Sequence, residues 1–368
     1  MDHLRVIIAG GGTGGHIFPA VAIAHALERM HPGVELLFVG AKGRMEMEKV
    51  PQAGFRITGL DIAGFNRSNM LKNLSLPFKL LKSAWQARQI LGSFAPDVAV
   101  GVGGYASFPV LNAAQRRGIP TVIQEQNSFA GKSNKLLGRK ASAICVAYPE
   151  MDRFFPKEKL VLTGNPVRKP IADSLVTRTE GQEWLGLDET RKTILVVGGS
   201  LGARTVNEAI DNHLGQILEE DVQLIWQTGK PYYEQAQKRA EDFPGRVKVF
   251  EFIRQMEYAY AAADLIVSRA GALAIAELCI VAKPVIFVPY PFAAEDHQTG
   301  NAMALVAHNA AMMIPDNDAK EELAKKIRHL LHDTVMQEIM TQNIKKLAIR
   351  DADEQIAEQV TMAAKRKV

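Results

Sequence analysis

The stretch LRVIIAGGGTGGHIFPAVAIAHALERM, residues 4–30, decides the fold of the first half of the chain. Its first six residues are apolar apart from one arginine, a glycine turn follows, and residues 18–30 repeat apolar positions at helical spacing. An apolar run without alternation is typical of a parallel strand that is buried on both faces. The order strand, glycine turn, helix therefore predicts a doubly wound α/β domain.

The same order continues along the chain and then starts again. Apolar runs follow at residues 35–39, 97–102, 121–124 and 143–147, and a second series begins at 193–197 and continues at 222–227, 247–250, 265–268 and 285–288. Gly164, Pro166 and Pro170 interrupt the periodicity between the two series. A chain of 368 residues also suits two cores better than one. We expect two Rossmann-like domains, residues 1–163 and 164–345, that face a ligand-binding cleft.

The composition excludes several classes of protein. Hydrophobic residues make up 47% of the chain and charged residues 23%, with a formal net charge of +4, so neither disorder nor nucleic-acid binding is expected. The two cysteines, Cys145 and Cys279, lie in apolar stretches and are expected to be buried thiols of a cytoplasmic protein. No apolar run is long enough to span a membrane, so any membrane contact should be peripheral.

The first glycine turn, Gly10–His16, matches the spacing G-x-G-x-x-G of dinucleotide sites. We reject a dinucleotide because the second strand ends in Phe38-Val39-Gly40, without the acidic residue that would hold a ribose. Backbone N–H groups at a helix N-terminus still favour an anion. His16 would then lie beside the bound group, although a capping or packing role for this histidine is an equally good interpretation.

Three further turns follow predicted strands, at residues 101–105, 198–203 and 268–273. Glycine turns at several strand ends indicate a ligand rich in phosphate. Glu277 lies on the helix after the last turn, where its carboxylate could accept both hydroxyls of a ribose. The alternative is a solvated helix glutamate, which the apolar neighbours Ile275, Ala276 and Leu278 disfavour. No metal-ligand spacing occurs, so helix dipoles and an arginine would have to neutralise a leaving diphosphate.

Seven motifs together resemble the MurG family of peripheral membrane glycosyltransferases, over essentially the whole chain. They are GGTGGH at 11–16, GGY at 103–105, EQN at 125–127, NPVR at 165–168, GGSLGA at 198–203, RAGALAIAE at 269–277 and DHQTGNA at 296–302. The resemblance implies the two-domain GT-B fold, with a C-terminal helix at about 346–368 that packs back on the first domain. It implies an inverting hexosyltransferase that moves N-acetylglucosamine from UDP-N-acetylglucosamine to the 4-hydroxyl of N-acetylmuramic acid in lipid I, forming lipid II.

The resemblance also implies which residues bind the donor. They are Thr13, Gly14, Gly15, Asn127, Arg168, Ser200, Ile253, Ala272, Leu273, Glu277 and Gln298. Ile253 would meet the uracil, Glu277 the ribose and Gln298 the sugar hydroxyls, while Ser200 and the amides of Ala272 and Leu273 would meet the phosphates. Ala274 and His297 depart from residues that relatives carry, a threonine and a glutamine.

The acceptor and the proton transfer are assigned to the first domain. By the same resemblance, the acceptor diphosphate is expected at the glycine turns, with Gly103, Gly104 and Tyr105. His16 is the first candidate for the base that removes the proton of the attacking hydroxyl, and Glu125 is the second. We expect neither a cofactor nor a metal.

Residues 73–91 are expected to form a helix with two apolar stripes on opposite sides. One stripe holds Leu74, Phe78, Leu81 and Trp85, and the other holds Leu76, Leu80, Ala84, Ala87 and Leu91. A surface helix needs one apolar face, so the surplus stripe, with Lys82 and other cations beside it, predicts contact with an anionic membrane. The alternative is a helix sandwiched inside the protein. The resemblance implies the cytoplasmic face of the cell membrane and association with proteins of cell-wall synthesis and division.

Two other classes of function remain open from the sequence. The first is a different enzyme of the same fold, such as a UDP-N-acetylglucosamine 2-epimerase or a diacylglycerol glucosyltransferase. The second is a scaffold that binds a sugar nucleotide without catalysis. An NAD-dependent oxidoreductase is more remote because of the missing acid at Gly40.

Overall fold

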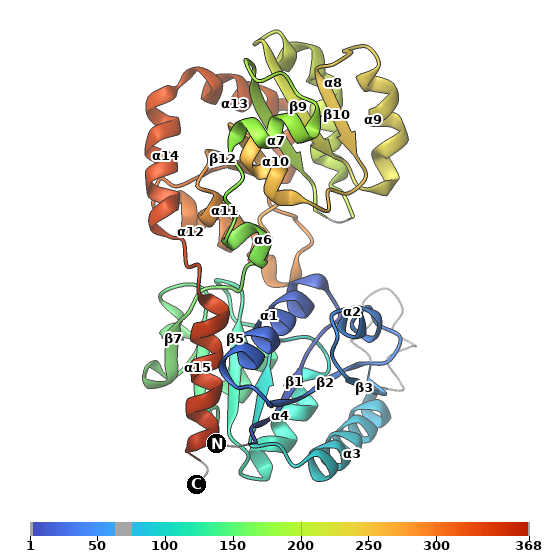
Figure 1. The fold of residues 1–368 in the computed structure, drawn as a ribbon, viewed down its shortest axis with the longest axis vertical. Helices are drawn as coiled ribbons and strands as arrows, with labels where there is room; N and C mark the ends of the chain where they lie inside the picture. The colour runs from blue at the N-terminus through green and yellow to red at the C-terminus, as the bar shows by residue number, and fades with distance from the viewer. Residues whose placement is uncertain (1–2, 63–75, 200, 367–368) are drawn as a thin grey trace. The chain divides into compact units, whose positions relative to one another are not determined.

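The computed structural model describes residues 3–62, 76–199 and 201–366 and divides the chain into two compact units (Figure 1). The first unit comprises the residues up to Val167 together with those from Asp351 onward, and the second comprises Arg168–Arg350. The sequence predicted the division after residue 163 and a C-terminal helix, from about residue 346, that packs on the first unit. Each unit contains one parallel sheet, so the predicted α/β class with two doubly wound domains is confirmed.

The sheet of the first unit has the strand order β3-β2-β1-β4-β5-β6-β7. The strands are β1 (Arg5–Ala9), β2 (Glu35–Ala41), β3 (Ile57–Leu60), β4 (Val98–Gly101), β5 (Thr121–Glu125), β6 (Ala143–Val146) and β7 (Leu160–Leu162). Val6 of β1 lies opposite Leu36 on one side and Val98 on the other, both in parallel pairs. The order reverses between β1 and β4, so the turns after these two strands meet at the switch point where such sheets bind ligands.

Helices cover both faces of this first sheet. They are α1 (Gly14–Met30), α2 (Glu46–Gln52), α3 (Leu76–Phe94), α4 (Ser107–Arg116), α5 (Lys132–Gly138) and α15 (Ala352–Lys365), with 3-10 turns at Met151–Arg153 and Lys157–Lys159. Helices α1 and α15 share one apolar core with the sheet, and α3, α4 and α5 share the core on the other face. Arg29 of α1 pairs with Asp353 of α15 at 2.8 Å, which attaches the C-terminal helix to the first unit.

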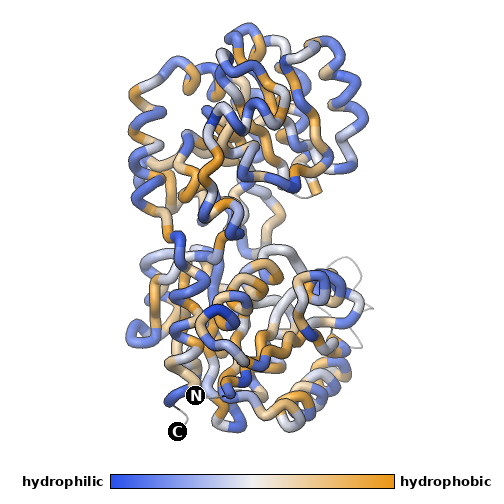
Figure 2. The backbone as a smooth tube through the Cα atoms, viewed as in Figure 1, coloured by the Kyte–Doolittle hydropathy of each residue, from blue (hydrophilic) through white to orange (hydrophobic). Residues whose placement is uncertain are grey.

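The sheet of the second unit has the order β10-β9-β8-β11-β12-β13. The strands are β8 (Lys192–Val197), β9 (Val222–Gln227), β10 (Val247–Phe250), β11 (Leu265–Ser268), β12 (Val285–Phe287) and β13 (Met312–Met313). All the described pairs are parallel, and the strands are mostly apolar along their length (Figure 2). This composition follows from burial on both faces of the sheet.

Nine helices of the second unit are described. They are α6 (Lys169–Ala172), α7 (Arg178–Leu185), α8 (Arg204–Leu218), α9 (Tyr233–Ala240), α10 (Met256–Ala262), α11 (Ala272–Val281), α12 (His297–Val306), α13 (Ala319–His332) and α14 (Thr334–Lys346), with 3-10 turns at Lys230–Tyr232, Ala294–Asp296 and Asp316–Asp318. Helices α8 and α13 share one core with the sheet, around the fully buried Trp226.

Two further features concern membrane spanning and the reactivity of the thiols. Within the described part of the chain, no helix is long and apolar enough to cross a membrane. Cys145 and Cys279 are both buried and free, as expected, and burial raises the pKa of each thiol to about 12. Both cysteines are therefore inert apolar residues at neutral pH.

Candidate active site

The first two glycine turns touch each other at the switch point of the first sheet. Gly11 donates its N–H to the carbonyl oxygen of Gly103 at 3.2 Å. A Cβ atom on Gly104, which has φ +85°, would lie 2.1 Å from the carbonyl oxygen of Gly11. Any larger residue at 104 would force the two backbones apart, so the packing of the two turns requires glycine at this position.

The N-terminus of α1 is the part of this region that can receive an anion. Thr13 is the N-cap residue in an extended conformation, and its side chain does not cap the helix. The first N–H groups of a helix have no acceptor within the helix, and they carry the positive end of its dipole. Thr13 and Gly15 are exposed and Gly14 is half-buried, so the predicted anion site is open to solvent.

His16 lies in the first turn of α1, between the two glycine turns. Its Nδ1 atom is 3.1 Å from the carbonyl oxygen of Gly11 and 3.2 Å from Oγ1 of Thr13. A Cβ atom on Gly103 would lie 2.8 Å from both Nε2 and Cδ2 of His16, so this edge of the ring packs against that glycine. A carbonyl oxygen only accepts hydrogen bonds, so Nδ1 carries the proton, and Nε2 has the lone pair in the neutral ring. The ring therefore packs in the turn and also presents the atom that a base requires.

Glu125, the second candidate for the base, is 2% exposed at the end of β5. Its carboxylate accepts hydrogen bonds from Asn134 Nδ2 at 2.8 Å and from the N–H groups of Gly131 and Asn127. Burial raises the pKa of Glu125, and these three donors oppose the rise. This position holds the loop before α5 in place and suits a structural role better than proton transfer.

Buried amides join the EQN and NPVR motifs within the first unit. Gln124 Nε2 donates to Asn165 Oδ1 at 2.9 Å, and Asn165 Nδ2 donates to the carbonyl of Gln126 at 2.9 Å. Gln126 donates to the carbonyl of Val102, which follows β4. This network orders the loop that carries the half-buried Asn127. The motifs indicated function, but their spacing alone did not reveal that they bond to each other.

In the second unit, Arg168 and Glu277 form an ion pair through two hydrogen bonds. Arg168 Nε donates to Glu277 Oε1 at 2.8 Å, and Arg168 Nη2 donates to Oε2 at 3.2 Å. Tyr260 donates its hydroxyl to Glu277 Oε2 at 3.0 Å. Glu277 is only 7% exposed, so the interpretation as a solvated helix glutamate is wrong.

Arg168 and Tyr260 are permanent donors to the Glu277 carboxylate. Burial raises the pKa of Tyr260 well above its ordinary value, and the negative charge of Glu277 adds to the rise. Burial lowers the pKa of Arg168, but the Glu277 carboxylate outweighs this effect and the net shift is upward. Tyr260 is a site residue that the sequence did not reveal, because its helix α10 shows only an apolar pattern.

The N-terminus of α11 lies one to two turns before Glu277. Gly271 is the N-cap residue in an extended conformation and, as a glycine, has no side chain to cap the helix. Ala272 and Leu273, the expected phosphate contacts, are half-buried in the first turn of this ten-residue helix. The positive end of the helix dipole therefore lies within two turns of the Arg168–Glu277 pair.

The remaining donor residues have partners of their own. Ile253 is buried and donates its N–H to Gln227 Oε1 at 2.9 Å. Gln298 Oε1 accepts the N–H of Tyr290 at 2.9 Å, so contact with a sugar would have to use its amide nitrogen or replace this bond. Ser200 lies outside the described residues. Ile253 follows β10, and Gln298 lies in the first turn of α12.

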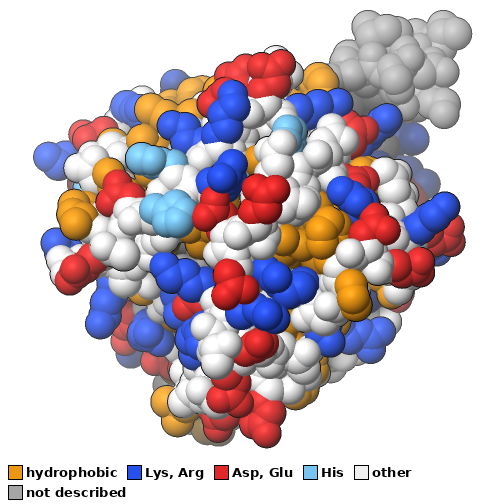
Figure 3. Space-filling view, turned by 90° about the horizontal axis from the view of Figure 1, so that it is seen from above, with side chains coloured by type: hydrophobic (Ala, Val, Ile, Leu, Met, Phe, Trp, Pro, Cys, Tyr) orange, Lys and Arg blue, Asp and Glu red, His pale blue; other side chains and the backbone are white. Residues whose placement is uncertain are grey.

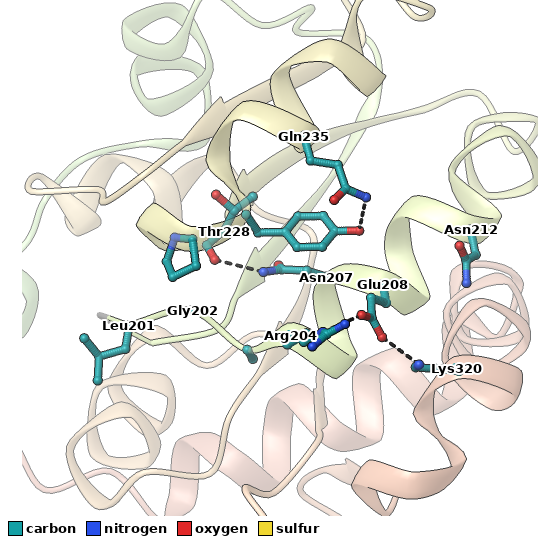
Figure 4. Close-up of a pocket in the computed structure, with 12 residues that line it drawn as sticks. Leu201, Gly202, Arg204, Asn207, Glu208, Asn212, Thr228, Gln235 and Lys320 are labelled. Carbon is teal, nitrogen blue, oxygen red and sulfur yellow. Dashed lines mark hydrogen bonds and ion pairs between the residues drawn. The ribbon is translucent and has the colours of Figure 1, made fainter.

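A pocket of about 660 Å³ borders the third glycine turn (Figure 4). Leu201, Gly202 and Ala203 form one wall, and none of the predicted donor residues that the structure describes lines it. Its polar side chains bond to protein groups: Asn207 donates to the carbonyl of Thr228 at 2.8 Å, and Glu208 pairs with both Arg204 and Lys320 at 2.6 Å. We assign no ligand to this pocket.

Helix α3 exposes the first of its two predicted stripes. Phe78, Leu81 and Trp85 are 75%, 72% and 58% exposed. In the second stripe, Ala87 and Leu91 are buried but Leu80 is 50% exposed, so this stripe is covered only toward the end of the helix. The alternative of a sandwiched helix is therefore wrong for the described part of α3. Leu74 lies outside the described residues. Lys82 forms an ion pair with Asp61 at 2.9 Å, which offsets the charge expected to meet a membrane.

Metal and nucleic-acid sites were not expected. Within the described residues, no three His, Cys, Asp or Glu side chains form a group that could hold a metal ion. On the face shown in Figure 3, acidic and basic side chains are interspersed among the described atoms. The absence of a cofactor and of nucleic acid as a partner remains a prediction.

Comparison with known proteins identifies the family. The glycosyltransferase family 28 N-terminal domain matches residues 6–146, and the family 28 C-terminal domain matches residues 193–356. A protein of Phocaeicola vulgatus is 54% identical over 362 residues, covering 98% of this chain and 96% of its own length. A protein of Parabacteroides distasonis is 50% identical over 368 residues, and this alignment covers 100% of both proteins.

Both relatives are named UDP-N-acetylglucosamine--N-acetylmuramyl-(pentapeptide) pyrophosphoryl-undecaprenol N-acetylglucosamine transferase. The crystal structure of Acinetobacter baumannii MurG matches with a TM-score of 0.81 and 31% identity, covering 98% of this chain and 99% of that one. The predicted GT-B fold agrees with this match. The chain therefore belongs to glycosyltransferase family 28, within the family of N-acetylglucosamine transferases that these full-length relatives represent.

Proposed function

We propose that this protein transfers N-acetylglucosamine from UDP-N-acetylglucosamine to the 4-hydroxyl of N-acetylmuramic acid in lipid I, with inversion at the anomeric carbon, and so forms lipid II. The observation that carries the proposal is the paired, buried carboxylate of Glu277, one to two turns after the N-terminus of α11. A carboxylate is a strong acceptor for ribose hydroxyls, and N–H groups with positive charge favour a diphosphate. The names of the full-length relatives supply the sugar and the acceptor.

The donor would be held as follows. Arg168 and Tyr260 each donate to Glu277, but two carboxylate oxygens offer about four lone-pair sites. Three of these sites hold the Arg168 and Tyr260 donors, so Glu277 keeps the capacity to accept one ribose hydroxyl. The second hydroxyl would have to replace one of these donors. The N-terminal turn of α11, with Ala272 and Leu273, would stabilise the charge that develops on the leaving UDP. Arg168, whose side chain is 39% exposed, would add positive charge on the same side.

The chemical step would be a single in-line displacement. The acceptor hydroxyl attacks C1 of the donor sugar, the bond between C1 and the phosphate oxygen breaks, and UDP leaves with the bonding electron pair. His16 would take the hydroxyl proton at Nε2, which requires the neutral ring with its proton on Nδ1. A positioned base of this kind contributes about 10²- to 10⁴-fold in rate.

The acceptor is a membrane lipid, so the protein must reach a membrane surface. We propose that the exposed stripe Phe78, Leu81 and Trp85 of α3 inserts into the headgroup region of an anionic membrane. Apolar side chains with cations beside them favour such a surface. This placement implies peripheral association at the cytoplasmic face, where proteins of cell-wall synthesis and division would be partners.

A turnover assay tests the proposal. The protein is incubated with UDP-N-acetylglucosamine and a short-chain lipid I analogue, with and without EDTA, and the products are analysed by mass spectrometry. We expect an acceptor heavier by one N-acetylglucosamine residue and equal turnover in EDTA. Epimerised donor with unmodified acceptor would instead indicate an epimerase, and no turnover would indicate a binding scaffold.

A further inference from the structure

Glu46 is a buried carboxylate that the sequence reasoning did not single out. It lies at the start of α2 and is 1% exposed. Its Oε2 atom accepts the N–H of Gly12 at 2.8 Å, and its Oε1 atom accepts the N–H of Ala41 at 2.9 Å. No Lys, Arg or His within the described residues lies at ion-pair distance from it, although burying an unpaired carboxylate is costly.

The surrounding glycines leave space for this carboxylate. A Cβ atom on Gly11 would lie 2.4 Å from Cδ of Glu46, and one on Gly40 would lie 2.5 Å from Cγ. Gly11 and Gly12 also have φ values of +137° and +91°, which glycine adopts readily. Glu46 thus lies between the first glycine turn and the end of β2, and it accepts a hydrogen bond from each.

The Gly11–Gly12 peptide unit links Glu46 to His16. The N–H of Gly12 points to Glu46, and the carbonyl of Gly11, which belongs to the same planar unit, accepts from Nδ1 of His16 at 3.1 Å. In a trans peptide the C=O and N–H bonds point in opposite directions. A carboxylate only accepts hydrogen bonds, so it fixes the orientation of this peptide, and the carbonyl is forced to face His16.

We propose that Glu46 is a positioning residue that sets the tautomer of His16 through the Gly11–Gly12 peptide, keeping the proton on Nδ1 and the lone pair on Nε2. If the peptide turned over, its N–H would face Nδ1, and the proton of the neutral ring would move to Nε2. The Thr13 hydroxyl, 3.2 Å from Nδ1, could support either tautomer because a hydroxyl both donates and accepts. The Glu46 carboxylate, through the peptide that it orients, favours the Nδ1–H tautomer.

The proposal rests on the proposed function only for its catalytic consequence, so it is tested first without substrate. The protein is labelled with ¹⁵N-histidine, and the ring nitrogens are observed by NMR at a pH where the rings are neutral. His16 is assigned among the nine histidines by its absence from the spectrum of H16Q. Wild-type protein and E46D, which keeps an acceptor-only group, should show His16 protonated on Nδ1.

E46Q replaces the carboxylate with a group that also donates, so it should give a mixture of tautomers or the Nε2–H form. The matched control is E48Q, on the same helix, because Glu48 has a side chain 70% exposed and bonds only to side chains of that helix. E48Q should leave the His16 signals unchanged. A wild-type His16 protonated on Nε2, or an E46Q spectrum identical to wild type, would overturn the proposal. If E46Q fails to fold, the E46D variant decides. A His16 ring protonated on Nε2 beside the retained carboxylate would contradict the proposal.

The kinetic consequence is tested separately. E46Q should lower kcat by about one to two orders of magnitude, since a positioned base contributes about 10²- to 10⁴-fold, and should leave the KM for UDP-N-acetylglucosamine unchanged. A merely structural role would alter both constants or neither. An altered tautomer with unaltered kcat would show that Glu46 positions His16 but that His16 is not the base, which separates this inference from the proposed mechanism.

Discussion

Arg168 and Glu277 lie 109 residues apart in the sequence, yet the guanidinium and the carboxylate meet through two hydrogen bonds of 2.8 and 3.2 Å in the second unit. Tyr260 adds a third donor at 3.0 Å. The pairing orients the buried carboxylate and stabilises its negative charge. A carboxylate fixed in this way suits an acceptor of ribose hydroxyls.

We predict that E277Q impairs use of the donor without unfolding the protein. The substitution keeps the shape of the side chain but removes the charge that accepts the ribose hydroxyls. Hydrogen bonds to a charged group are worth about 1.5–3 kcal/mol, which corresponds to a roughly ten- to 150-fold loss in kcat/KM for UDP-N-acetylglucosamine. E183Q, at an exposed position of α7 in the same unit, is the control. Unaltered UDP affinity and kcat/KM in E277Q would remove Glu277 from the donor site.

For His16, we predict a loss in the chemical step rather than in donor affinity. H16A should lower kcat by about two orders of magnitude or more and abolish the acidic limb of the kcat pH profile. Binding of UDP should change little. H25A is the control, because His25 is an exposed residue of the same helix. A mutant that kept the wild-type acidic limb would show that another group is the base.

A pH dependence follows from Glu125. Burial raises its pKa in the folded state, so folding favours the protonated carboxyl. The resulting stabilisation is complete below the ordinary glutamate pKa of about 4.3 and is lost as the pH rises through the folded-state value. The free energy of unfolding of wild type should therefore fall relative to E125Q, with a slope of at most about 1.4 kcal/mol per pH unit. Chemical denaturation of both proteins at several pH values gives this difference, and parallel curves would contradict it.

Membrane contact is tested with the double variant F78S/W85S. Removing two exposed apolar side chains from α3 should weaken sedimentation with anionic liposomes, because the buried area that drives interfacial binding is reduced. Transfer to a short-chain acceptor in detergent should be retained. W184S, which removes an exposed tryptophan from the second unit, serves as the control. Equal sedimentation of F78S/W85S and wild type would exclude this stripe as the contact.

Much of the fold could be predicted because buried parallel strands carry a strong local signal. The runs at residues 121–124 and 222–227 match β5 and β9 within one residue. The short strands β3, β7 and β13 were missed, because these edge strands have two to four residues and lack a continuous buried run. Such strands are fixed by pairing with a neighbour rather than by their own pattern.

The site could be predicted only where the chemistry is local. The glycine turns, His16 and Glu277 stand out because glycine after a strand and a glutamate among apolar residues are unusual. Glu46 does not, because RMEMEK at residues 44–49 has the composition of a solvated helix. Tyr260 and the loop-holding role of Glu125 depend on contacts between distant segments. No spacing rule encodes such contacts, so they required the three-dimensional structure.

The most direct test of inverting transfer is one proton NMR measurement on a completed reaction of UDP-N-acetylglucosamine with a short-chain lipid I analogue. The anomeric proton of the transferred sugar reports the configuration of the new bond. A single displacement on the α-linked donor predicts a β-linked N-acetylglucosamine on the 4-hydroxyl of the acceptor. An α-linked product would contradict the single displacement, and an unchanged acceptor with epimerised donor would contradict transfer itself.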